Sequence, residues 1–295
     1  MEGNSVRHST SVLSAIAVFV FFAALSPCNG QQQLLRAAEP VQISLSPLPF
    51  VLQGLLRHPD VDGRLPAVVL LPICEGYARS LDQDWGARIA GWGFVTLTLD
   101  SFGARGLKNC GGGSPPYLDL SVDAYRGLEF LIQKNYVDPK RIALVGFAWG
   151  AWQTLSATER GTIERAAAHK FRAAAAFYPA CDSFKGVMTV PTLIVIGERD
   201  DWASADACRK LAAGEDDMGI SRQKDVGAPI QLMVLAEASH GFDLPAFQTP
   251  IQYQGGHHLA FDKSAAEHSR EGLRKFLQST WHALQAGLIR RPKCQ

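Results

Sequence analysis

The chain has 295 residues, of which 47% are hydrophobic and 19% charged, and its formal net charge is +1. This length and composition are enough to bury one large core, and we expect a single domain rather than two with small cores. The basic residues are scattered rather than clustered, which excludes the electrostatic footprint of a nucleic-acid-binding protein. We therefore expect no nucleic-acid partner.

Residues 1–30 have the layout of a secretory signal peptide. Two basic residues precede an uncharged apolar run over residues 12–25, and small residues follow at Cys28 and Gly30. The apolar run is shorter than the about 20 residues that span a bilayer, so we predict cleavage after Gly30 rather than an uncleaved anchor, which is the alternative. The mature domain, residues 31–295, is then exported to the periplasm or secreted, without a stable membrane span.

From about residue 40 the chain alternates short β-rich runs with helical stretches, which is the pattern of a mostly parallel sheet covered by helices on both faces. The expected strands are residues 41–45, 50–58, 67–71, 94–99, 141–147, 173–178, 192–197 and 230–235. The expected helices are residues 80–90, capped by Ser80, then 117–135, a stretch from about 149, and 263–285. Residues 137–139 are expected to form a turn, and residues 242–258 a loop over the functional site.

The strand expected over residues 141–147 leads directly into Gly146-Phe147-Ala148-Trp149-Gly150. A strand that ends in G-x-Ser/Cys-x-G and opens into a helix is a nucleophile elbow, in which the two glycines relieve crowding at a sharp turn. Here the glycine frame is complete, but Ala148 occupies the nucleophile position. The turn is predicted without the chemical group that it usually presents.

Two further strands are followed by loops that contain carboxylate and histidine side chains, the types that act as acid and base in catalysis. Asp200 and Asp201 follow the strand over residues 192–197, and His240 follows the strand over residues 230–235. The chain order of nucleophile position, acid and histidine is the order of α/β hydrolases. Loops at the carboxyl edge of a parallel sheet are also where such folds place their sites.

From about residue 66 to residue 277 the sequence resembles the dienelactone hydrolase family of α/β hydrolases. Beside the elbow, the matching segments are residues 68–72 with Gly76, Asp100-Ser101-Phe102-Gly103, Ala124-Tyr125, Val137-Asp138-Pro139, Phe177-Tyr178-Pro179, Ile196-Gly197-Glu198 with Asp200-Asp201-Trp202, and Ser239-His240-Gly241-Phe242-Asp243. The resemblance implies an α/β-hydrolase fold and hydrolysis of esters or lactones through a Ser or Cys nucleophile, a His base and an Asp that orients it. No cofactor is implied.

Carried over to this chain, the resemblance makes His240 the general base and Asp200 its partner. Asp201 is the competing acid. Asp200 is favoured because it is the third residue after Gly197, the usual spacing in the family, whereas Asp201 can cap the following helix.

The resemblance also implies an oxyanion hole built from the backbone N–H groups of Cys74 and Trp149. Thiol enzymes of the family carry a glutamate just before the first of these residues, but this chain has Ile73 there and Glu75 on the other side. This departure weakens the case for thiolate chemistry. Trp202 and Phe242, with Trp149, are expected to line an aromatic-edged pocket.

Export makes disulfide pairing the default expectation for the cysteines. Cys74 and Cys110 both follow strands near the site, and Cys181 and Cys208 follow strands of the second half, so we predict these two pairs and leave Cys294 over. The alternative is that several are small buried hydrophobes.

No metal site is expected. The cysteines form no C-x-x-C pair, and the adjacent His257 and His258 diverge without an evident third ligand.

Alanine cannot form an acyl-enzyme, so the functional prediction stays open. Three explanations compete: an engineered Ser/Cys→Ala replacement, a natural non-catalytic relative that keeps its pocket for binding, and an enzyme that uses another group, either water activated by His240 or Cys74. We favour hydrolase descent with weak or absent standard activity. A small-molecule binding protein is the alternative class. In each case the expected partner is an ester, a lactone or a hydrophobic small molecule.

Overall fold

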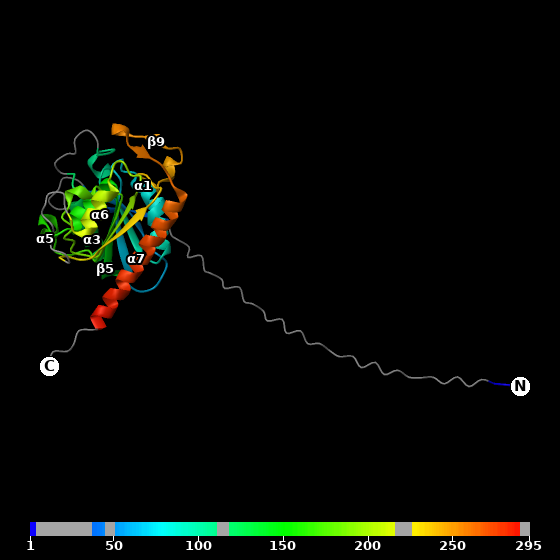
Figure 1. Ribbon diagram of the computed structural model, residues 1–295. Coiled ribbons are helices and arrows are strands. Elements are labelled where there is room, and N and C mark those ends of the chain that lie inside the picture. The colour runs from blue at the N-terminus through cyan, green and yellow to red at the C-terminus, as the bar shows by residue number, and fades with distance from the viewer. Residues whose placement is uncertain (4–36, 45–50, 111–117, 216–225, 290–295) are drawn as a thin grey trace. The chain divides into compact units, whose positions relative to one another are not determined.

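The computed structural model describes residues 1–3, 37–44, 51–110, 118–215 and 226–289 (Figure 1). The expected signal peptide falls mostly outside these residues, as does Cys294. The chain divides into two compact units, Met1–Gln32 and Gln33–Gln295, and every helix and strand named below belongs to the second. Within the described ranges, no helix is long and apolar enough to cross a bilayer.

The core of this unit is an eight-stranded sheet in the order β1-β2-β4-β3-β5-β6-β7-β8. Its strands are β1 (Glu39–Ile43), β2 (Leu52–Arg57), β3 (Leu65–Leu71), β4 (Val95–Asp100), β5 (Val137–Phe147), β6 (Ala173–Phe177), β7 (Thr192–Gly197) and β8 (Ile230–Leu235). β2 pairs antiparallel with both β1 and β4, and the pairs from β4 through β3 to β8 are parallel. The predicted α/β fold with a mostly parallel sheet is confirmed.

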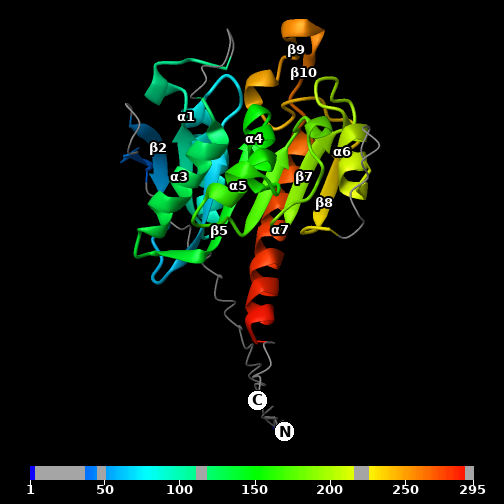
Figure 2. The same ribbon diagram turned by 90° about the vertical axis from the view of Figure 1, so that its left-hand side faces the viewer.

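Helices cover both faces of the sheet, as expected for a mostly parallel sheet whose strands β3, β6 and β7 are almost entirely apolar. The helices are α1 (Ala78–Leu81), the π-helical η1 (Asp82–Gly86), α2 (Ala87–Gly91), α3 (Leu120–Ile132), α4 (Trp149–Thr158), α5 (Thr162–Ala166), α6 (Ala205–Ala213) and α7 (Lys263–Ile289), with short 3-10 turns at η2 (Gly103–Arg105) and η3 (Cys181–Ser183). Figure 2 shows α3 and α4 on the side of the sheet that faces the viewer. The core on the opposite face holds side chains of η1, α2 and α7.

Most element bounds differ from the predicted ones by a few residues, and two of these differences have a clear structural cause. The helical stretch after β3 begins at Ala78, following Tyr77 with φ 43°, so Ser80 lies inside the helix rather than capping it. β5 begins at Val137 instead of residue 141, because Val137 pairs with Leu65 before an irregularity in the register. The predicted turn at residues 137–139 is therefore part of a strand with a bulge.

The segment expected to form a loop over the site contains a small hairpin. The segment contains the 3-10 turns η4 (Pro245–Phe247) and η5 (Gln254–Gly256) and the strands β9 (Ile251–Gln252) and β10 (His258–Leu259). β9 pairs antiparallel with β10, and Leu259 forms an isolated bridge with His240. In Figure 2 the hairpin lies beyond the upper ends of the strands, at the edge where β5, β7 and β8 end.

Candidate active site

The nucleophile elbow lies between β5 and α4. Ala148 has φ 49° and ψ −111°, and its N–H donates to the Phe177 carbonyl at 3.0 Å. A Cβ at Gly146 would lie 2.1 Å from the Gly150 carbonyl oxygen, and one at Gly150 would lie 2.5 Å from the Pro72 carbonyl oxygen. Both glycines are therefore required by the close approach of backbone. The strained turn is intact and presents the methyl group of Ala148 to a cavity.

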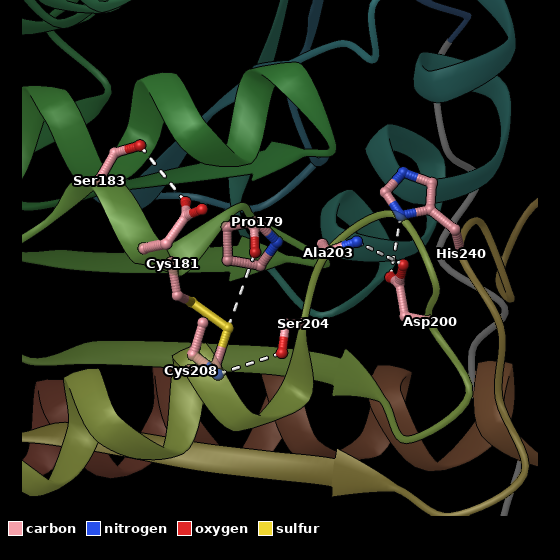
Figure 3. The surroundings of a disulfide bond; sticks show 10 residues. Pro179, Cys181, Ser183, Asp200, Ala203, Ser204, Cys208 and His240 are labelled. Carbon is pink, nitrogen blue, oxygen red and sulfur yellow. Dashed lines mark hydrogen bonds and ion pairs between the residues drawn. A yellow bond between two sulfur atoms is a disulfide. The ribbon is translucent and has the colours of Figure 1, made fainter. Parts of the chain in front are cut away.

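His240 pairs with Asp200 across two loops at the same sheet edge. Its Nδ1 lies 2.9 Å from Asp200 Oδ2, and both residues are buried. The other carboxylate oxygen, Oδ1, accepts the backbone N–H groups of Trp202 at 3.0 Å and Ala203 at 2.7 Å. Figure 3 shows His240 and the Ala203 backbone converging on this carboxylate. Because Asp200 holds Nδ1, Nε2 is the nitrogen that can take a proton from a bound molecule.

The structure separates the two aspartates that the sequence left in competition. Asp201 does not cap the following helix; its carboxylate accepts the backbone N–H of His258 at 3.0 and 3.2 Å. The cap of α6 is Ser204, whose Oγ accepts from the Ala207 N–H at 3.3 Å. The suggestion that Asp201 caps the helix was therefore wrong, because Asp201 instead holds the hairpin strand β10.

Both residues expected to supply the oxyanion hole line the same cavity as Ala148. Trp149 is the first residue of α4, so its N–H lies at the positive end of the helix dipole. Cys74 lies in the loop after β3 and is disulfide-bonded to Cys110. A disulfide sulfur is not a thiolate, so the alternative in which Cys74 acts as the nucleophile is contradicted by the structure.

The second disulfide joins Cys181 to Cys208, so both predicted pairs are present. Cys181 follows β6, and Cys208 lies in α6, the helix that comes after the Asp200 loop. Figure 3 shows this bond to the left of the Asp200 and His240 pair. It links two segments that border the site.

The cavity has a volume of about 290 Å³, the lower end of the range for small-molecule sites. It is lined by Ile73, Cys74, Glu75, Cys110, Ala148, Trp149, Trp152, Tyr178, Ala180, Trp202, Ala203, His240, Gly241, Leu244, Phe247 and Leu259. The expectation that Phe242 lines the pocket was wrong. Gly241 has φ 69° and turns the chain, and Phe242 is fully buried against Tyr178, with 5.4 Å between ring centroids.

A buried polar network lies behind His240. The Tyr178 ring meets the His240 ring edge-on at 4.7 Å, and its hydroxyl donates to Asp243 Oδ1 at 2.8 Å. The Trp85 Nε1–H donates to Asp243 Oδ2 at 2.6 Å. Burial raises the pKa of the Asp243 carboxyl, while the two donors act in the opposite direction. Burial and the neighbouring Asp243 charge raise the pKa of Tyr178, which keeps its hydroxyl protonated as a donor.

Replacing Asp243 with Ala should destabilise the protein, because it leaves the Trp85 and Tyr178 donors buried and unpaired. We expect Asp243→Ala to lower the free energy of unfolding by about 2 kcal/mol, measured by urea denaturation. Asp206→Ala, which removes an exposed carboxylate, is the control and should change it by less than about 0.5 kcal/mol. Equal effects of the two substitutions would contradict a structural role for the network.

Two residues of the site could not be recognised from the sequence: Glu75, which lines the cavity, and Tyr253, its partner. The Tyr253 hydroxyl donates to Glu75, and this hydrogen bond is the main cause that raises the pKa of Tyr253 to about 12. The Tyr253 ring stacks on Trp202 at 5.4 Å, and His257 also stacks on Trp202, at 4.9 Å. Tyr253 and His257 lie in a segment whose sequence has no periodicity, so the sequence gave no signal for these contacts.

His257 and His258 are used as hairpin contacts. His257 Nδ1 lies 3.1 Å from the Asp201 carbonyl oxygen, and the backbone of His258 binds the Asp201 side chain. Across the described residues, no group of three or more His, Cys, Asp or Glu side chains is placed to hold a metal ion.

Comparison with known proteins agrees with this geometry. Residues 114–280 match the model of the dienelactone hydrolase family, and the chain belongs to that family. It is 29% identical over 157 residues to Lipase 1 of Moraxella sp. (strain TA144), a region that covers 52% of this chain and 45% of the lipase. The chain thus spans less than half the length of that relative.

Solved structures share the fold at low sequence identity. The dienelactone hydrolase-like promiscuous phosphotriesterase P91, from metagenomic libraries, is similar with a TM-score of 0.59 and 18% identity, covering 83% of this chain and 99% of that chain. Esterase 2 of Thermogutta terrifontis, phosphorylated by paraoxon, is similar with a TM-score of 0.58 and 16% identity, covering 80% of this chain and 91% of that chain. These likenesses show that the chain shares the fold of these structures, and the family itself is given by the match over residues 114–280.

Proposed function

We propose that this chain is an exported member of the dienelactone hydrolase family that binds a small ester, lactone or hydrophobic ligand and does not form an acyl-enzyme at residue 148. The observation that carries the proposal is that one cavity is lined both by Ala148 and by His240, which is paired with Asp200. The methyl group offers neither a lone pair nor a proton, so the covalent route has no nucleophile there. The apolar, aromatic lining keeps the features of a binding pocket.

Export is part of this proposal. Its support is the composition of residues 1–30 together with the two disulfides, which persist in oxidising compartments. The proposal also takes Ala148 to be the residue of the natural chain, so that ligand binding in the pocket is the function that the protein retains.

Ligand binding is tested by thermal shift with a panel of small esters, lactones and aromatic compounds. A ligand present at 100 times its Kd should stabilise the folded protein by about 2.7 kcal/mol, seen as a rise of several degrees in Tm. Ala180→Trp is the matched control, because Ala180 is an exposed residue on the cavity wall and added bulk there should abolish the shift. A broad panel without any shift in the wild type would refute the binding proposal.

A second candidate function is slow hydrolysis by water that His240 activates. It is favoured by the retained Nδ1 contact of His240 with Asp200. In this reaction the water oxygen attacks the carbonyl carbon while one of its protons passes to His240 Nε2. The ester C–O bond then breaks, and the leaving alkoxide receives that proton from His240. If this route operates, the wild type should hydrolyse p-nitrophenyl acetate slowly, and His240→Ala should not exceed the rate in buffer alone. Equal hydrolysis rates for the wild type and His240→Ala would exclude the route.

A further inference from the structure

Among the described residues, the cavity carries a negative side chain without a basic one beside it. Glu75 and His240 are the ionisable side chains of its lining, apart from the buried Tyr178, and no lysine or arginine occurs among the described lining residues. Glu75 is half-buried, and it accepts a hydrogen bond from the neutral hydroxyl of Tyr253, which leaves the negative charge uncompensated. No ion pair to Glu75 occurs in the described part of the chain.

The surroundings of His240 add negative charge. The Asp200 carboxylate lies directly behind the His240 ring, and a polar hollow that shares Trp202 with the cavity is lined by further carboxylates, including Asp201 and Glu198. Arg209 pairs with Glu198 and Asp206, and His257 Nδ1 lies 3.7 Å from Asp201 Oδ1. Asp200 instead receives backbone N–H groups and the His240 ring. In a partly desolvated cavity such charges favour a cation and oppose an anion.

The walls of the cavity are aromatic. Trp149 and Trp152 stack on each other with 5.3 Å between centroids. Trp202 also lines the cavity and packs against His240 and Tyr253. Phe247 contributes a further ring to the lining. Aromatic rings attract cations through their negative faces, and a ring-lined pocket with a carboxylate is a recurring way to bind quaternary ammonium groups.

We propose that the cavity selects a small monocation, namely an ester or other carbonyl compound that carries a quaternary or protonated amine. Glu75 lies beside the cationic group, the tryptophan rings surround it, and the carbonyl oxygen faces the N–H of Trp149 at the helix terminus. This specificity rests on the proposed function of the pocket. It sets the chain apart from a site for dienelactone itself, whose carboxylate would meet Glu75 without a compensating cation.

Tyr253 belongs to the hairpin segment and is hydrogen-bonded to Glu75. Two substitutions can therefore test the charge of Glu75 and its contact with the hairpin separately. Glu75→Gln removes the charge but keeps a carbonyl oxygen that can accept from Tyr253. Tyr253→Phe removes the hydrogen bond but keeps the charge. The probes are acetylcholine and 3,3-dimethylbutyl acetate, which have nearly the same shape and differ in the positive charge.

Isothermal titration calorimetry of the full mature chain measures both probes against each variant. We expect the wild type to bind acetylcholine about tenfold more tightly than 3,3-dimethylbutyl acetate. The preference should fall to less than about threefold in Glu75→Gln and persist in Tyr253→Phe. Melting temperatures of the variants close to that of the wild type verify that each is folded.

Three results would overturn the inference: equal affinities in the wild type, a preference that survives in Glu75→Gln, or no binding of either probe. None of these results decides the proposed function. That function is tested separately, by thermal shifts with the panel of esters, lactones and aromatic compounds and by the activity of Ala148→Ser.

Discussion

Ala148→Ser is expected to convert the protein into an esterase with a kcat/KM for p-nitrophenyl acetate about 10²-fold or more above that of the wild type. The reason is that the elbow backbone, the His240 and Asp200 pair and the Trp149 N–H are already in place. The gain recovers part of the roughly 10⁶-fold that a nucleophile contributes in serine proteases. Ala148→Cys should also gain activity, though the departure at Ile73 makes the serine variant the better test.

The control for this gain is the double variant Ala148→Ser with His240→Ala. A serine that acts through the His240 base loses its advantage when the base is removed. We therefore expect the double variant to hydrolyse the ester no faster than the wild type. A serine variant without any gain, or a gain that persists without His240, would contradict the interpretation of the site.

Gly146→Ala is expected to cause a large loss of stability for so small a change. The added Cβ would lie 2.1 Å from the Gly150 carbonyl oxygen and 2.4 Å from Thr154 Oγ1, so backbone must move. Overpacking of this kind costs about 3 kcal/mol or more when neither partner can yield. Urea denaturation should show this decrease in the free energy of unfolding, or the variant should fail to fold.

Gly161→Ala is the matched control, because the same methyl group there meets its nearest atom at 3.7 Å and φ is −161°. Its effect should stay within about 0.5 kcal/mol. If Gly146→Ala were as stable as Gly161→Ala, the backbone of the elbow would be less closely packed than these distances require.

Much of the sheet could be predicted because strands such as β3, β6 and β7 are almost uninterrupted apolar runs. The bounds of β7 and β8 agree with the prediction, since each run is flanked by residues that end a strand. The start of the helix after β3 could not be predicted, because it depends on Tyr77 adopting φ 43°, a conformation unfavourable for tyrosine. The early start of β5 was hidden by Pro139, which indicates a turn and here lies in a bulge.

The candidate site was predictable where a motif fixes both sequence and geometry. The glycine frame around Ala148 and the loop positions of Asp200 and His240 are of this kind. Phe242 was misplaced because the turn at Gly241 directs the next side chain into the core. The contact of Glu75 with Tyr253 arises from the packing of a hairpin against a distant loop, which no local pattern encodes.

The central claim, that this hydrolase site lacks its nucleophile, is tested most directly by covalent labelling with paraoxon. Intact-mass spectrometry after incubation should show an unmodified wild type and a single diethyl phosphate on Ala148→Ser, located in the peptide that contains residue 148. Labelling of the wild type at another residue would reveal a different nucleophile and contradict the claim.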